Sequence, residues 1–160
     1  AKLKVQEDEI PAQIDKVQAE MKDMQQQLAQ VAEMREKADA ASLIAGLQNV
    51  SGVNVVCGKA NAASMDELRD VADLTSSKID DPSVVVLACA NDGKVNLVVK
   101  ASKAATAKGI HAGKIIKEAA QTVGGGGGGR PDMAQAGGKN AEAIPAAFDK
   151  AVEVIKAQLS

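Results

Sequence analysis

The clearest pattern in the chain is a run of apolar residues near its N-terminus, spaced alternately four and three apart. Such a heptad seam is typical of a helix that pairs with another helix. It predicts a long helix over residues 11–45, with Pro11 in the first turn and an end at Gly46 or within residues 49–52. At ~1.5 Å per residue this helix would be roughly 50 Å long. The seam residues are Ile10, Ile14, Val17, Met21, Met24, Leu28 and Val31.

The spacing changes after Val31, where a strict repeat would bring Arg35 into the seam. A shift by three residues, a stammer, keeps the seam apolar and makes Met34, Ala38, Ala41 and Ala45 the inward positions. A narrow seam on so long a helix favours pairing of helices, within one chain or between two; packing on its own domain is the alternative. We expect a homodimer, with contacts from Ile14, Val17, Met21, Met24, Leu28 and Val31.

Beyond this helix the apolar pattern alternates between strand-like and helix-like segments. The fold class predicted is α+β: a long N-terminal coiled-coil-like helix followed by a globular domain of a β-sheet flanked by helices. We place the helical, coiled-coil-like domain at residues 1–48 and the globular domain at 49–160. Asn91-Asp92-Gly93 predicts a tight hairpin turn between antiparallel strands. The expected strands are residues 53–57, 83–90 and 94–100.

Three further helices are expected. Ser64 and Glu67 have the spacing of a capping box and predict a helix start, with Met65, Leu68, Val71 and Ala72 facing inward. A second helix covers residues 112–123, with Ala112, Ile115, Ile116, Ala119, Ala120 and Val123 on one face. Asn140 caps a first turn before the closing helix, where Pro145 suits the N1 position. The buried face of that helix is predicted to be Phe148, Ala151, Val152, Ile155 and Leu159.

The net charge of −2 conceals an uneven distribution. Residues 94–139 carry eight basic and two acidic side chains, whereas the rest of the chain is acidic. A basic segment of this kind marks a possible docking site for a polyanion, and a solvated lysine face is the alternative. Because Phe148 is the only aromatic residue, stacking of bases on aromatic rings is excluded as the main means of binding.

Composition limits the class of protein. At 46% hydrophobic and 25% charged residues the chain fits one globular domain with an appendage. It has no apolar run of the ~20 residues that a membrane helix needs and no signal-peptide pattern. Its first residue, Ala1, is not methionine, which suggests a processed or excised piece.

Residues suited to catalysis or metal binding are few. His111 is the only histidine; it is interpreted as a residue of a first helical turn, with an RNA contact as the alternative. Cys57 and Cys89 lack CxxC spacing and are interpreted as buried, reduced thiols, which favours a cytoplasmic origin. The carboxylates at 66, 67, 70 and 73 fit a solvated helix face. We therefore expect no catalytic site, no metal and no cofactor.

A run of six glycines is the most unusual feature of the chain. A flexible linker is one interpretation; the other is a loop whose backbone N–H groups reach a ligand without obstruction by side chains. The surrounding residues fit neither a P-loop nor a dinucleotide-binding G-x-G-x-x-G turn. The run and its continuation read GGGGGGRPDMAQAGG. Its members are Gly124, Gly125, Gly126, Gly127, Gly128 and Gly129, followed by Arg130.

This string closely resembles a signature of the C-terminal domain of bacterial alanyl-tRNA synthetases, a DHH-associated domain. The resemblance extends to the order of elements over essentially the whole chain. It implies a non-catalytic module of an alanine–tRNA ligase that binds the elbow of tRNA, helps couple aminoacylation with editing and contributes to dimerisation. It also implies that residues 124–129 and Arg130 face RNA, with Lys100, Lys103, Lys108 and Lys114 on the basic side of the domain.

Two other functions compete with this one: an accessory domain of a phosphoesterase and a scaffold module. Phosphoesterases of the DHH superfamily usually carry a shorter glycine run followed by His, where this chain has Arg130, and no DHH half is present. An oligomerisation or scaffold module without RNA contact is the alternative function, with the basic segment as a solubilising face. The sequence predicts no membrane partner.

Overall fold

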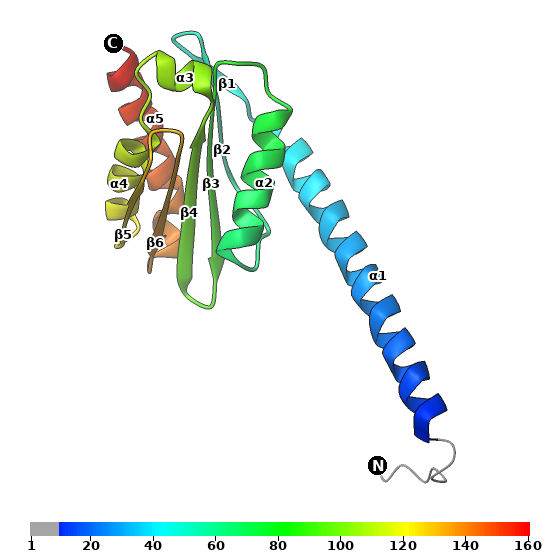
Figure 1. Cartoon of the computed structure of the whole chain (residues 1–160). Coiled ribbons are helices and arrows are strands. Elements are labelled where there is room, and N and C mark those ends of the chain that lie inside the picture. The colour runs from blue at the N-terminus through cyan, green and yellow to red at the C-terminus, as the bar shows by residue number, and fades with distance from the viewer. Residues whose placement is uncertain (1–9) are drawn as a thin grey trace. The chain divides into compact units, whose positions relative to one another are not determined.

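The computed structural model describes residues 10–160, so the start of the domain expected at 1–48 lies outside the described residues. The chain divides into two compact units, the first ending at Arg35 and the second spanning Glu36–Ser160 (Figure 1). This division falls inside a helix and not at residue 48, because the last turns of that helix belong to the second unit, where Leu43 is part of a hydrophobic core. The two units are described separately.

The N-terminal helix α1 spans Ile10–Ile44, which confirms the helix predicted from the seam. Its seam side chains from Ile10 to Val31 are 43% to 65% exposed. A row of large apolar side chains in contact with water is typical of a surface that pairs with another helix. The structure thus shows an exposed seam on α1, and pairing of two helices through it stays a prediction.

The position of the apolar face changes at the end of α1. Met34 is exposed, as are Ala38, Ala41 and Ala45, whereas Ala40 and Leu43 are buried. The last turns thus bury Ala40 and Leu43, which the predicted stammer does not include, and pairing through the stammer positions stays a prediction. Leu43 lies against Gly58, in the space that a Cβ on this glycine would occupy, and packing of that pair sets which face of α1 is buried.

Six strands form one sheet in the order β1-β2-β3-β4-β6-β5. All neighbours are antiparallel except β2 and β3, which are parallel. The predicted hairpin is confirmed, with Asp92 and Gly93 at positive φ between its strands. The strands are β1 (Gln48–Val50), β2 (Val53–Lys59), β3 (Ser83–Asn91), β4 (Lys94–Ala101), β5 (Gly126–Gly129) and β6 (Met133–Gly138).

The first helix stops just before Gly46, which confirms one of its two predicted ends, whereas the other, residues 49–52, belongs to the β1–β2 hairpin. Ser51 and Gly52 form its turn, both at positive φ, and the Asn49 side chain accepts a hydrogen bond from the Gly52 N–H at 3.2 Å. The helix itself stops earlier, at Ile44, where Gly46 N–H bonds to the Leu43 carbonyl. Asn and Gly at these positions favour a turn as strongly as a helix end, so the local sequence does not separate the two.

Helices cover both faces of the sheet (Figure 1). Helices α4 (Ala112–Thr122) and α5 (Ile144–Leu159) pack on one face, and α2 (Met65–Ser77) packs on the other. The short α3 (Lys103–Ala107) and the 3-10 turn η2 (Ala141–Ala143) complete the unit. The predicted α+β class is confirmed.

Most local predictions for these helices are also confirmed. The Glu67 N–H donates to Ser64 Oγ at 3.1 Å, and all six residues of the predicted apolar face of α4 are buried. The Glu142 N–H donates to the Asn140 side chain at 3.1 Å, and Pro145 lies in the first turn of α5. On α5 the fully buried side chains are Ile144, Ala147, Ala151 and Ile155, with Phe148, Val152 and Leu159 only partly buried.

A pair of leucines tests the assignment of the buried face at the end of α1. We expect Leu43→Ala to lower the free energy of unfolding by about 2 to 3 kcal/mol, because Leu43 is 8% exposed and its loss opens a gap over Gly58. Leu47→Ala, the same change at a residue that is 38% exposed, should cost less than about 1 kcal/mol. Urea unfolding of both variants measures the difference, and equal losses would contradict the assignment.

Candidate nucleic-acid interface

The glycine run forms an edge strand. Gly126–Gly129 pair in antiparallel register with β6, and within the run only Gly124 has a positive φ, of 66°. Most of the run is therefore a strand and neither a flexible linker nor the loop expected over residues 124–129, and contact of its backbone with a ligand stays a prediction. Glycine is a poor strand former alone, but without side chains the strand can lie very close to β6, and the ladder hydrogen bonds then hold it there.

The glycines of β5 alternate in what surrounds them. A Cβ on Gly127 would collide with Ala136 Cβ and the Gln135 carbonyl, and one on Gly129 would lie 2.6 Å from Ala134 Cα. A Cβ on Gly126 or Gly128 would meet no atom within 4 Å. Packing therefore explains glycine at 127 and 129, whereas nothing in the fold requires it at 126 and 128.

The open glycines belong to a side-chain-poor surface, here named the glycine face. Residues paired across strands point to the same side of a sheet, and successive residues alternate. The register places Gly126 beside Gly137 and Asn96, and Gly128 beside Gln135 and Val98. This surface is opposite the face that α4 covers. The glycine face comprises Asn96, Gly126, Gly128, Gln135 and Gly137.

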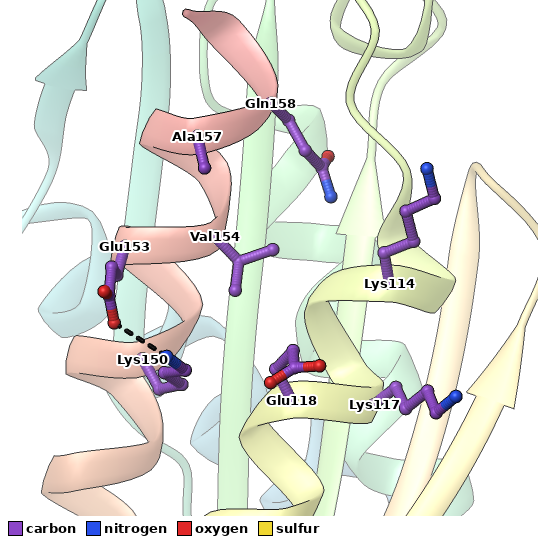
Figure 2. Close-up of a pocket in the computed structure, with 8 residues that line it drawn as sticks. All are labelled: Lys114, Lys117, Glu118, Lys150, Glu153, Val154, Ala157 and Gln158. Carbon is purple, nitrogen blue, oxygen red and sulfur yellow. Dashed lines mark hydrogen bonds and ion pairs between the residues drawn. The ribbon is translucent and has the colours of Figure 1, made fainter.

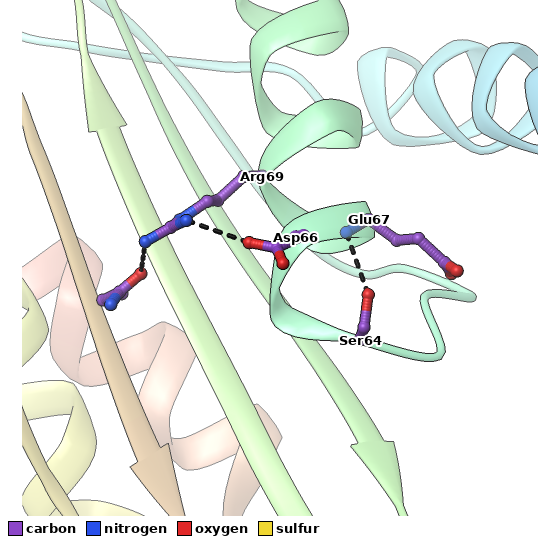
Figure 3. A network of polar contacts seen from close by, with 5 residues as sticks. Ser64, Asp66, Glu67 and Arg69 are labelled. Atoms are coloured by element: carbon purple, nitrogen blue, oxygen red, sulfur yellow. Dashed lines mark hydrogen bonds and ion pairs between the residues drawn. The ribbon is translucent and has the colours of Figure 1, made fainter.

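An arginine from α2 reaches the glycine face. Arg69 donates one guanidinium N–H to Asp66 Oδ1 at 3.0 Å and another to Gln135 Oε1 (Figure 3). Its side chain is 39% exposed, so the guanidinium is held in place and still open to solvent. Sequence reasoning missed Arg69, because it lies far from the glycine run in the chain.

Two more cations flank the same end of the face. Arg130 Nε lies 3.5 Å from Asp132 Oδ1, and Lys100 Nζ lies 2.5 Å from Asp73 Oδ1. An open hollow lies at this end of the glycine face. It is lined by Arg69, Gly128, Arg130, Met133 and Gln135 among others. Bare backbone beside arginine side chains suits a phosphate-bearing ligand, because one guanidinium group can donate two parallel hydrogen bonds to two oxygens of a phosphate.

Two of the other lysines predicted to face RNA, Lys108 and Lys114, lie on other surfaces. Lys103 and Lys108 belong to α3 and its C-cap, and Lys108 Nζ donates to the Gly52 carbonyl at 3.0 Å. That carbonyl lies in the β1–β2 hairpin, and β1 and β5 are opposite edges of the sheet. Of the four predicted lysines, Lys100 lies beside the glycine face and Lys108 and Lys114 do not, and contact of Lys103 with RNA stays a prediction.

Lys114 lies in a hollow between α4 and α5, on the far side of the sheet (Figure 2). The hollow contains two further lysines, Lys117 and Lys150, and the carboxylates of Glu118 and Glu153. Lys150 bonds to Glu153 at 3.0 Å, which raises the pKa of its ammonium group. This hollow has three lysines and two glutamates, and at the glycine face Arg69, Lys100 and Arg130 each have an aspartate partner, so charge alone does not separate the two surfaces. The bare backbone at Gly126 and Gly128 does.

The surroundings of the two cysteines and the histidine fit a role in packing and helix capping. Cys57 and Cys89 are free, which fits the expected reduced thiols. Burial, with a contribution from Asp149, raises the pKa of the half-buried Cys57 to about 12, and burial raises that of Cys89. His111 is the N-cap residue of α4, and its backbone N–H donates to Gln158 Oε1 at 2.7 Å. Within residues 10–160 no His, Cys, Asp and Glu side chains are grouped as a metal site requires.

Comparison with known proteins shows the family of the chain. The model of the DHHA1 domain matches residues 51–157, which include the whole sheet except β1. The chain belongs to the DHHA1 domain family. The C-Ala domain of alanyl-tRNA synthetase from Aquifex aeolicus is similar to it in structure, with a TM-score of 0.63 and 32% identity. That match covers 69% of this chain and 97% of the other.

Curated relatives of this DHHA1 domain have the name alanine–tRNA ligase. The protein from Oceanobacillus iheyensis is 40% identical over 96% of this chain, and that from Bacillus pumilus is 38% identical over 99%. The chain spans 17% and 18% of the length of these two relatives. It is thus related to the C-terminal module of alanyl-tRNA synthetases, as the sequence resemblance indicated.

A more distant structure shares only the fold. It is the DHH domain of a member of a family of ribosomal proteins, with a TM-score of 0.54 at 12% identity over 80% of this chain. In the part of the chain that the structure describes, no helix is long and apolar enough to span a membrane.

Proposed function

We propose that this DHHA1 domain is a non-catalytic tRNA-binding module of an alanyl-tRNA synthetase. In this proposal the glycine face binds the elbow of tRNA and so helps couple aminoacylation with editing on one tRNA. The observation that carries it is the pair Gly126 and Gly128, where an added Cβ would meet no atom within 4 Å, so that packing does not require glycine. Glycine at such positions suits close approach of another molecule to the backbone.

The chemistry around these glycines supports a nucleic-acid backbone as that molecule. Arg69 and Arg130 supply charge-assisted donors to phosphate, and Gln135 supplies a neutral amide. No aromatic ring is available there, since the single Phe148 belongs to α5, which packs on the other face of the sheet. Recognition would therefore depend on the shape and backbone of folded RNA and not on stacking. Arg130, Lys100 and residues 124–129 are the predicted RNA contacts retained here.

We also propose that the exposed seam of α1 joins two copies of the chain. A helix that leaves this seam in water is stabilised when a second seam covers it. The same seam favours the second candidate function, an oligomerisation or scaffold module that does not contact RNA. The two functions differ in what the glycine face binds.

Titration of the full chain with tRNA tests the proposed function. If about four phosphates are neutralised, the logarithm of the association constant should fall with a slope of roughly −3 to −4 against the logarithm of salt concentration. Arg130→Ala and Arg69→Gln should each weaken binding several-fold, whereas Lys117→Gln on α4 should leave the affinity close to that of the wild type. Fluorescence anisotropy at several salt concentrations measures both quantities.

The same assay distinguishes the two candidate functions. Folded tRNA should bind more tightly than an unfolded RNA of equal length, and different tRNAs should bind with similar affinity, because the contacts go to their shared shape. Equal affinity for folded and unfolded RNA, or no binding by the wild type, would contradict the elbow proposal and favour the scaffold.

A further inference from the structure

A second group of cations lies at the other end of the glycine face. Val95 of β4 pairs with Gly138 of β6, so Lys94 and Lys139 are the next residues along these neighbouring strands. Both lysines are exposed. They line one open hollow, whose floor consists largely of glycine backbone from residues 124, 125, 137 and 138.

The charges of this lysine pair are uncompensated. Among the described residues, no carboxylate lies within 4.0 Å of either ammonium group. At the opposite end of the face, Arg69, Arg130 and Lys100 each have an aspartate partner. Like charges at neighbouring cross-strand positions repel one another. An anion bound between Lys94 and Lys139 would remove this repulsion and gain attraction from both.

The two cationic ends are too far apart for one small anion. Lys94 and Lys100 are six residues apart on one strand, which corresponds to roughly 20 Å at ~3.4 Å per residue. The rows between them contain Asn96, Gly126, Gly128, Gln135, Gly137 and Val98, none of which is charged. A free phosphate could occupy one end, whereas an extended polyanion such as a chain of phosphates could bind both at once.

We propose that Lys94 and Lys139 form a second phosphate anchor, so that one RNA backbone runs along β5 and β6 from Arg130 to the lysine pair. This inference depends on the proposed function, since it assumes that the glycine face binds RNA. The bare backbone between the anchors lets the RNA lie against the sheet over the whole distance. The lysine pair thereby fixes the direction in which the RNA crosses the domain.

The double variant Lys94→Gln/Lys139→Gln tests the anchor in the full chain, with tRNA as the probe. Loss of two phosphate contacts should make the salt slope less steep by about 1.5 to 2 and lower the affinity at least tenfold near ~0.1 M salt. The control Lys117→Gln/Lys156→Gln removes the same charge from α4 and α5. It should change the salt slope and the logarithm of the affinity by no more than about a third as much as the test variant does.

The outcomes separate the two proposals. If both double variants behave alike while Arg130→Ala still weakens binding, the second anchor is refuted and the proposed function stands. If the wild type does not bind tRNA at any salt concentration, both are refuted. A change in slope specific to the Lys94 and Lys139 variant supports the anchor, and circular dichroism of the same samples establishes that the fold is retained.

Discussion

Gly128→Val is expected to lower the affinity for tRNA at least tenfold while leaving the stability of the domain nearly unchanged. The new side chain would project from β5 into open space beside Arg69 and Gln135, where the proposal places the RNA backbone. Because a Cβ at this position meets no atom of the protein within 4 Å, the free energy of unfolding should change by less than about 0.5 kcal/mol. Anisotropy titration and thermal unfolding of one sample measure both quantities.

Gly127→Val is the matched control one residue away. Its side chain would point to the other side of the strand and collide with Ala136 and the Gln135 carbonyl. We expect it to destabilise the domain by more than about 2 kcal/mol through separation of β5 from β6. If Gly128→Val instead bound tRNA as the wild type does, close approach of RNA to this backbone would be excluded.

Met24→Asp is expected to weaken dimerisation of the chain at least 100-fold. Met24 is near the middle of the exposed seam of α1, where two copies would place their side chains in contact. A carboxylate at this position would be desolvated on pairing without a partner, which costs several kcal/mol. Sedimentation velocity over a range of concentrations measures the dissociation constant.

Gln26→Asp is the control, because it adds the same charge on the face of α1 away from the seam. It should leave the dimer essentially intact. A wild type that stays monomeric at the highest concentration, or equal effects of the two variants, would contradict pairing through the seam.

The elements governed by local sequence could be predicted, and those governed by distant partners could not. The capping box at Ser64, the hairpin turn at Asp92 and Gly93 and the apolar face of α4 all depend on residues within a few positions of one another. Strand β5 depends on β6: a run of glycines has no strand preference of its own, and only pairing with residues 133–138 makes it a strand.

The candidate site was predicted in part for the same reason. The glycine run and Arg130 stand out in the sequence, and both border the glycine face. Arg69 reaches it only because α2 packs over β4, and Lys94 and Lys139 meet only through the register of β4 and β6. Lys108 and Lys114 are close to the run in sequence, yet the fold directs them to other surfaces, and contact of these two and of Lys103 with RNA stays a prediction.

Amide hydrogen exchange of the full chain, with and without tRNA, tests the central claim most directly. Half of the amides of an antiparallel edge strand lack a ladder partner, so those of β5 exchange readily in the free protein. Binding at the glycine face should slow exchange in peptides covering residues 124–139 and leave those of α5 unchanged. Slower exchange confined to α4 and α5, with residues 124–139 unaffected by bound tRNA, would contradict the account.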